Sequence, residues 1–185
     1  MTIVEILRRA IATETPSESL APIAVENWGE IYKVAAKQGV FAIVYDYVKS
    51  LPTAEQPPKG LKLQWALNAE RIEKRYHKQS ALAGELAEIY ASENITTLVL
   101  KGLAISKYYP IAEHRECGDL DCFLGGEYER GNCLAESLGA KVTREYYKHS
   151  IIYYKKLMVE NHQFCIAIRG SRTLKAFERH LETII

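Results

Sequence analysis

The sequence predicts an α+β protein, with a helical N-terminal part packed on a small mixed or antiparallel sheet. Residues 1–92 carry helical patterns, and residues 95 onward begin with a strand, a helix, a strand and a helix. Three strand candidates then follow one another with no helix between them. This order is typical of an α+β domain and not of a fully parallel sheet. We therefore expect a helical N-terminal subdomain over residues 1–93 and an α+β core over residues 94–185.

The helical part contains four segments with helical or apolar patterns. Residues 1–12 form an amphipathic pattern with charged residues inside it, which argues against a signal peptide. Apolar residues recur at helical spacing over residues 28–36, and residues 40–48 form a second apolar segment. The longest pattern covers residues 61–92, and we interpret its apolar stripe, which repeats about every 3.5 residues, as packing surface. The stripe consists of Trp65, Ala69, Ile72, Tyr76, Gln79, Ala83, Leu86 and Tyr90.

The predicted core begins where the composition changes to β-branched and apolar residues. Residues 95–100 are a predicted buried strand, and Lys101-Gly102 forms a turn into a short helix over residues 103–108. A strand over residues 119–124 and a helix over residues 128–138 come next. The remaining elements are strands at residues 141–147, 150–154 and 158–166 and a charged helix at residues 172–185.

The composition is that of an ordinary globular protein, with 48% hydrophobic and 25% charged residues. A formal net charge of +1 gives no global argument for a nucleic-acid partner. No apolar run approaches the roughly 18 residues that a membrane span needs. The four cysteines show neither a C-x-x-C pair nor zinc-like spacing with histidine, so a reduced, cytoplasmic protein is the expectation.

One segment, residues 141–156, is rich in basic and tyrosine side chains. Interleaved aromatic and cationic residues can stack a base or guide a nucleic-acid strand. The same alternation is typical of two β-strands with one solvated face, and tyrosine is common in strands. We favour the second interpretation, so nucleic acid is not the expected partner, although the first interpretation stays open.

The most informative pattern is an aspartate pair, Asp119 and Asp121, placed before an apolar run. In a strand, alternate side chains point to the same face, so the two carboxylates would lie side by side. They repel each other and are costly to dehydrate unless a cation lies between them. The pair is therefore a candidate site for Mg²⁺, which prefers carboxylate and phosphate oxygens. The alternative is a solvated pair on the exposed face of an edge strand.

Glu160 is the best candidate for a third acid, because it stands alone inside an apolar strand pattern. A two-metal site for nucleotidyl transfer needs about three carboxylates that converge from neighbouring strands. The alternative for Glu160 is an edge-strand acid that faces water. His162 shares its face by the two-residue period and could orient a carboxylate or a phosphate, with a structural histidine as the alternative.

Three short motifs point to one family. They are Leu100-Lys101-Gly102-Leu103-Ala104, Arg115-x-x-Gly118-Asp119-Leu120-Asp121 and Val159-Glu160-Asn161-His162. Over about residues 95–164 the chain resembles the uncharacterised nucleotidyltransferase family of the polymerase-beta-like nucleotidyltransferase superfamily. The resemblance implies a nucleotidyltransferase-like fold in which Asp119 and Asp121 bind two Mg²⁺ (or Mn²⁺) ions and Glu160 completes the site.

The resemblance also implies how the triphosphate of an NTP is bound. The turn at Gly102 would bring backbone N–H groups to the phosphates, helped by the N-terminus of the short helix that follows. Lys101 and Arg115 would contact the phosphates, Arg115 as a bidentate donor. The alternatives for these two basic residues are salt bridges to Glu113 or Glu116.

The expected function is transfer of a nucleoside monophosphate from an NTP to a hydroxyl of an unknown acceptor, such as a small molecule, a protein or an RNA end. The alternative is a non-catalytic module that binds nucleotide or protein on a decayed nucleotidyltransferase fold. One departure favours the module, because Leu103 follows Gly102 where the superfamily often has serine, whereas the three intact acids favour the enzyme. A third possibility is a helical interaction protein that docks through residues 61–92.

Overall fold

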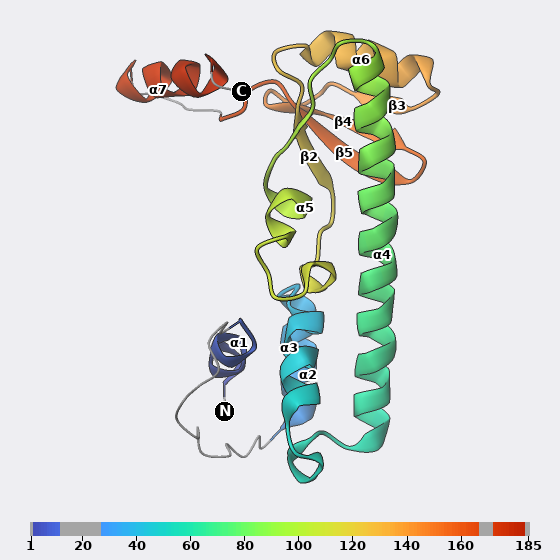
Figure 1. The fold of residues 1–185 in the computed structure, drawn as a ribbon, viewed down its shortest axis with the longest axis vertical. Coiled ribbons are helices and arrows are strands. Elements are labelled where there is room, and N and C mark those ends of the chain that lie inside the picture. The colour runs from blue at the N-terminus through green and yellow to red at the C-terminus, as the bar shows by residue number, and fades with distance from the viewer. Residues whose placement is uncertain (1, 12–26, 167–171, 184–185) are drawn as a thin grey trace. The chain divides into compact units, whose positions relative to one another are not determined.

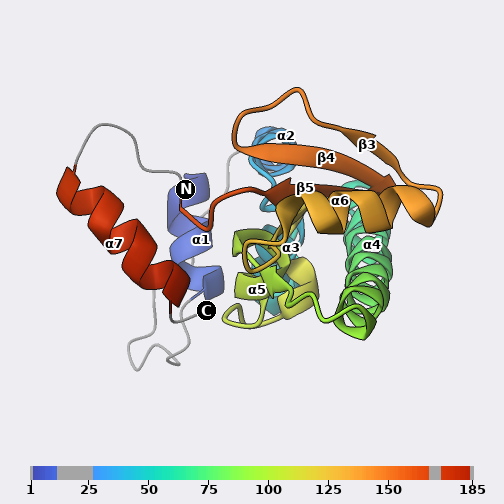
Figure 2. The same ribbon diagram turned by 90° about the horizontal axis from the view of Figure 1, so that it is seen from above.

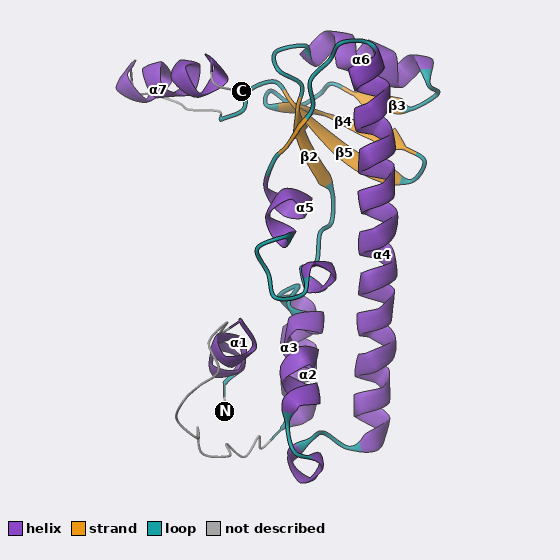
Figure 3. Cartoon of the chain, in the orientation of Figure 1, coloured by secondary structure: helices purple, strands orange, loops and turns teal. Residues whose placement is uncertain are grey.

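A computed structural model describes residues 2–11, 27–166 and 172–183 of the chain (Figure 1). These residues form helices, most of them in the N-terminal half, and one five-stranded mixed sheet, which confirms the predicted α+β class (Figure 3). The chain divides into two compact units, a first of Met1–His77 with Ser106–Glu116 and a second of Lys78–Ile105 with Cys117–Ile185. The two-domain boundary expected at residues 93 and 94 stays a prediction. No described helix has the length and apolar character that crossing a membrane requires.

The first unit is helical. Its elements are α1 (Ile3–Ile11), α2 (Trp28–Lys37), α3 (Phe41–Ser50), the first part of α4 (Lys59–Ser92) and the 3-10 helices η1 (Thr53–Glu55) and η2 (Ala112–His114). Asn27 caps α2, because its side-chain oxygen accepts a hydrogen bond from the backbone N–H of Glu30 at 3.1 Å. The fully buried Trp65 lies at the centre of this core and donates its indole N–H to the Phe41 carbonyl at 3.1 Å. Trp65, the first residue of the predicted apolar stripe, is therefore part of the core, as expected for packing surface.

The second unit is built on the sheet. Its strands are β1 (Leu98–Val99), β2 (Leu120–Phe123), β3 (Lys141–Thr143), β4 (His149–Tyr154) and β5 (Leu157–His162). Their order in the sheet is β1-β2-β5-β4-β3. β2 and β5 pair in parallel, and the other neighbours pair antiparallel. The two strands that carry the predicted acids are therefore direct neighbours.

Helices cover one face of this sheet. The second part of α4 and α6 (Tyr128–Ser137) contribute Leu86, Tyr90 and Ala135 to a core shared with apolar strand residues (Figure 2). The strand residues of this core are Leu120, Cys122, Ile152, Tyr154, Leu157 and Val159. Because strand side chains alternate, the residues between these point to the opposite face, which neither α4 nor α6 covers. Asp121 and Glu160 belong to that opposite face.

A tight turn joins β4 to β5. Lys155 and Lys156 form it with φ angles of +44° and +72°, the left-handed pair of a two-residue hairpin turn of type I′. The turn pairs Tyr154 with Leu157, and the register then pairs His149 with His162 at the other end of the hairpin. The turn thus decides which side chains meet near the acids.

Most predicted elements are present, and four of the five strands are shorter than expected. The strand predicted at residues 95–100 is reduced to β1, and the one predicted at 141–147 ends at Thr143. After Thr143 the chain is held by α6, because Arg144 forms a two-pronged ion pair with Glu136 at 2.6 and 3.0 Å. The last strand ends at His162 instead of residue 166. The C-terminal helix α7 spans Arg172–Thr183, and the last two residues of its predicted range lie outside the described residues.

Candidate metal centre on the sheet

The three predicted acids converge. Asp121 on β2 and Glu160 on β5 are register partners in the parallel pair, and Asp119 precedes β2 by one residue. One carboxylate oxygen from each lies within 4.8 Å of those of the other two. Two metal ions in a shared site lie about 4 Å apart, so this spacing can hold a divalent cation. We call Asp119, Asp121 and Glu160 the acidic trio.

Lys101 supplies a positive charge at the acidic trio. Its Nζ lies 2.8 Å from Oδ1 of Asp121, whose side chain is only 2% exposed. The hydrogen bond to Asp121 raises the pKa of Lys101 above its usual value, with smaller contributions from the charges of Glu160 and Asp119. Lys101 thus places an ammonium group against a carboxylate that is almost fully buried.

The predicted turn before the site is present. Lys101 has a φ of +24° and Gly102 a φ of +38° with ψ of −114°, so the backbone turns here before the rest of α5 (Lys101–Ser106). The two glutamates named as alternative partners of Lys101 contact other side chains: Glu116 pairs with Arg75 at 2.9 Å, and Glu113 approaches His77 at 3.9 Å. This leaves the Lys101 ammonium at the acidic trio.

Arg115 belongs to the other unit. It follows η2 in the first unit and is partly buried. Its predicted contact with a phosphate stays a prediction.

His162 touches two members of the acidic trio. Its Nε2 lies 3.0 Å from Asp121 Oδ1, a hydrogen bond in which the imidazole N–H donates, and 3.6 Å from Glu160 Oε2. The side chain is 17% exposed. His162 therefore lies against two carboxylates, and its role at the site stays a prediction.

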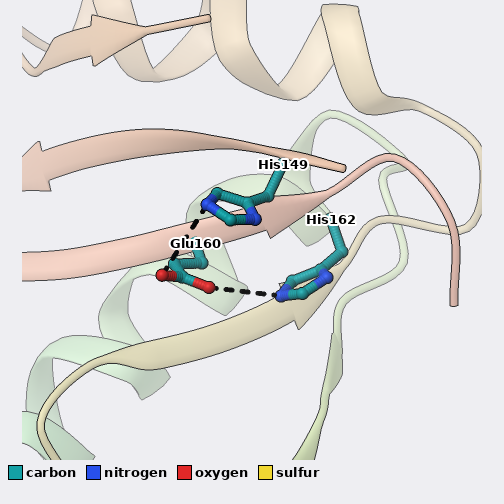
Figure 4. Close-up of side chains that lie close together, drawn as sticks. All are labelled: His149, Glu160 and His162. Atoms are coloured by element: carbon teal, nitrogen blue, oxygen red, sulfur yellow. Dashed lines mark ion pairs between the residues drawn. The ribbon is translucent and has the colours of Figure 1, made fainter. Parts of the chain in front are cut away.

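His149 is a neighbour of the site that sequence reasoning missed. Its Nε2 lies 3.7 Å from Glu160 Oε1, whereas His162 approaches the other carboxylate oxygen of Glu160 (Figure 4). The Tyr146 ring stacks on the His149 ring with centroids 5.2 Å apart and planes 20° apart. A two-residue turn at Lys155-Lys156 places His149 opposite His162, so recognition of this turn in the sequence would have placed His149 at the site. Two lysines do not have the Asn-Gly or Asp-Gly character that marks such a turn in a sequence.

The donor atoms of the acidic trio fit a hard divalent cation. All three residues offer carboxylate oxygens, the ligands that Mg²⁺ and Mn²⁺ prefer. Asp121 is buried beside two other acids, so a divalent ion would relieve more repulsion than the single charge of Lys101 does. The residues present are thus suited to the metal that the resemblance implies.

Comparison with protein-family models matches residues 24–184 to the uncharacterised nucleotidyltransferase family. Comparison with curated proteins and comparison with solved structures each gave no match. The match covers most of the chain, includes the acidic trio and Lys101, and extends the resemblance into the helical part before residue 95. The chain therefore belongs to the uncharacterised nucleotidyltransferase family.

Proposed function

We propose that this protein is a metal-dependent nucleotidyltransferase that moves a nucleoside monophosphate from an NTP to an acceptor hydroxyl. The observation that carries the proposal is the convergence within 4.8 Å of three carboxylates: Asp121 and Glu160 on two parallel neighbouring strands, and Asp119 one residue before β2. Membership of a nucleotidyltransferase family supports the NTP as substrate. The acceptor is a hydroxyl on a small molecule, a protein or an RNA end.

The acidic trio would hold Mg²⁺ or Mn²⁺. A divalent cation there would neutralise phosphate charge and lower the pKa of the acceptor hydroxyl, so no separate general base would be required. Asp119 and Asp121 would hold the ions, and Glu160, the register partner of Asp121, would complete the site. His162 holds the Asp121 carboxylate in place through its hydrogen bond of 3.0 Å.

Lys101 and the turn at Gly102 would bind the triphosphate. The Lys101 side chain is 62% exposed, so it can exchange the Asp121 oxygen for a phosphate oxygen at little conformational cost. Gly102 has a positive φ and no Cβ, so a phosphate can approach its backbone closely. Arg115 would add a bidentate contact to the phosphates.

Thermal unfolding in the presence of each NTP, with and without Mg²⁺ or Mn²⁺, tests this proposal. A ligand at 100 times its dissociation constant adds about 2.7 kcal/mol to the free energy of unfolding. We expect a metal-dependent rise in Tm for the wild type that is lost in Asp119→Asn/Asp121→Asn. The control is Glu88→Gln, an exposed carboxylate-to-amide change on α4, which keeps the rise. An equal rise in the double variant and the wild type would contradict the assignment of the acidic trio.

One observation favours the alternative of a non-catalytic module. Lys101 already provides a cation at Asp121, which a decayed site that no longer uses a metal could retain. The two functions differ in a measurable way. Stabilisation by an NTP that does not depend on metal, with no release of pyrophosphate, would favour the module.

A further inference from the structure

Two histidines and a glutamate form a second cluster beside the acidic trio. His149 on β4 and Glu160 and His162 on β5 each offer one ligand atom, and these atoms lie within 4.8 Å of one another (Figure 4). We propose that His149, Glu160 and His162 form a distinct site for a divalent transition-metal ion of the Zn²⁺ type. We call it the histidine site; its nitrogen donors distinguish it from the acidic trio.

The distances fit ligands around a common ion better than they fit direct hydrogen bonds. Glu160 Oε1 lies 3.7 Å from His149 Nε2, and Glu160 Oε2 lies 3.6 Å from His162 Nε2. Hydrogen bonds between nitrogen and oxygen are normally 2.7 to 3.2 Å long, so neither contact is a close one. Two ligand atoms that each lie about 2.1 Å from a tetrahedral ion are about 3.4 Å apart. Small rotations of the side chains would therefore suffice to close the site on an ion.

The donor set selects the kind of metal. Two imidazole nitrogens and one carboxylate are the ligands of many three-residue zinc sites, whereas Mg²⁺ takes oxygen ligands. The acidic trio offers oxygen alone. The two clusters thus prefer different ions although they share Glu160.

The surroundings hold the ligands in position and leave access for an ion. Tyr146 stacks on the His149 ring and helps to fix its orientation. His162 Nε2 donates a hydrogen bond to Asp121 at 3.0 Å, so this nitrogen must give up its proton before it can bind an ion. Asp121 is therefore close enough to serve as a further oxygen ligand once that N–H is lost. The side chains of His149, Glu160 and His162 are 17–20% exposed, so an ion and a water ligand can reach them.

Sharing of Glu160 couples the two sites. A carboxylate that is drawn toward the imidazoles is less available to the oxygen-only trio. Zn²⁺ at the histidine site is therefore expected to weaken the binding of Mg²⁺ or Mn²⁺ at the trio. This inference concerns the histidines themselves and holds whether or not the proposed transfer reaction is confirmed.

Titration of the full-length protein with Co²⁺, followed by displacement with Zn²⁺, tests the histidine site. Tetrahedral Co²⁺ absorbs visible light strongly, and coordination by imidazole and carboxylate lacks the charge-transfer band of a cysteine thiolate. We expect one Co²⁺ per chain with this spectrum, and Zn²⁺ should bleach it. His149→Ala should weaken Co²⁺ binding at least about tenfold. His149→Gln, which keeps a polar side chain, serves as the second variant if the alanine variant folds poorly.

Three further variants separate the histidine site from the acidic trio. Asp119→Asn should leave Co²⁺ binding in place and weaken Mn²⁺ binding, while Glu160→Gln should weaken both. The control is His77→Ala, since His77 lies 3.9 Å from the single carboxylate of Glu113. Equal Co²⁺ affinity in the wild type and His149→Ala would overturn the proposal. So would a thiolate band in the wild-type spectrum together with an unchanged titration of the variant.

Discussion

Histidines meet carboxylates in both units of the molecule, but with different geometry. In the first unit His114 is 3% exposed, and each of its ring nitrogens binds one carboxylate: Nδ1 to Asp46 at 2.6 Å and Nε2 to Glu73 at 2.8 Å. These are short, charge-assisted contacts that join η2 to α3 and α4. Both N–H groups donate, so the ring is an imidazolium and has no lone pair for a metal.

In the second unit the contacts of two histidines with a shared carboxylate are longer, although His162 also donates a hydrogen bond to Asp121 at 3.0 Å. Two imidazoles share one carboxylate, Glu160, at 3.6 and 3.7 Å, and both side chains are partly exposed. These contacts are too long for strong hydrogen bonds, so the charges are only loosely paired. The comparison indicates that short contacts at both ring nitrogens of a buried histidine fix the fold, whereas longer contacts on a partly exposed histidine leave a nitrogen that can bind a ligand.

The largest expected effect is on NTP turnover, and it is expected on substitution of Glu160, which the two proposed metal sites share. Glu160→Gln should lower metal-dependent NTP turnover by roughly a hundredfold or more, because it removes charge where a divalent ion must be held. Pyrophosphate release in saturating Mg²⁺ measures the effect, and Glu88→Gln is the matched control. Turnover of Glu160→Gln within about threefold of the wild type would remove Glu160 from the site.

The next largest effect is on stability at the buried histidine. His114→Gln should lower the free energy of unfolding by about 2 to 3 kcal/mol, because two charge-assisted hydrogen bonds are lost from a buried site. Burial by itself would lower the pKa of His114, but the hydrogen bonds to Asp46 and Glu73 outweigh it and raise the pKa. Urea unfolding of the wild type and the variant measures the difference.

The difference in the free energy of unfolding between the wild type and His114→Gln should decrease as the pH rises through the folded pKa of His114. Because the folded pKa of His114 lies above its ordinary 6.5, the contribution is complete below pH 6.5 and is lost as pH rises through the folded pKa. For Asp46, burial raises the pKa but the bonds to His114 and Lys49 lower it below 3.8, so its contribution is lost only as pH falls through that lowered value. The wild type should thus exceed His114→Gln most clearly between about pH 4 and 6.5. A difference that grows above pH 6.5 would contradict a charged His114.

Two helical glycines are expected to give smaller effects on stability, of opposite sign, when each is changed to alanine. A Cβ on Gly131 of α6 would lie 2.1 Å from Leu124 Cδ1 in the packed core, so Gly131→Ala should destabilise by about 1 to 3 kcal/mol. A Cβ on Gly84 of α4 meets nothing within 4 Å, so Gly84→Ala should stabilise by about 0.5 to 1 kcal/mol. Thermal unfolding distinguishes the two. Equal melting temperatures would mean that α6 does not pack on the sheet this closely.

The smallest effect on stability is expected at Lys101. The ammonium is largely exposed, so Lys101→Gln should change the free energy of unfolding by less than about 1 kcal/mol while it weakens NTP binding. Chemical denaturation and NTP titration measure the two quantities separately. A loss of more than about 2 kcal/mol would instead make Lys101 a structural counter-ion of Asp121.

Local pattern was sufficient to predict the elements and the acidic trio. The long helix α4 buries Trp65, Ala69, Ala83, Leu86 and Tyr90 of the predicted stripe, because one periodic face suffices for packing. Asp119 and Asp121 could be placed on one face by the two-residue period of a strand. Glu160 could be chosen because a lone acid in an apolar strand is unusual, and the parallel pairing of β2 with β5 then brings it to Asp121.

Contacts between distant segments could not be predicted in this way. Asp46, Glu73 and His114 come from three separate elements, and no periodicity links them. Lys101 was expected to contact a phosphate, with neighbouring glutamates as the alternative partners, but the left-handed turn at Lys101-Gly102 directs the side chain to Asp121. Turn geometry and strand register therefore determine contacts that the periodicity of the sequence does not predict.

The most direct test of the acidic trio is anomalous diffraction from crystals of the full chain grown with Mn²⁺ and a non-hydrolysable NTP. The account predicts anomalous peaks within about 2.5 Å of carboxylate oxygens of Asp119, Asp121 and Glu160, next to the triphosphate, and none at His114. Mn²⁺ and nucleotide bound elsewhere, with Lys101 still paired to Asp121 and no peak at these carboxylates, would contradict it.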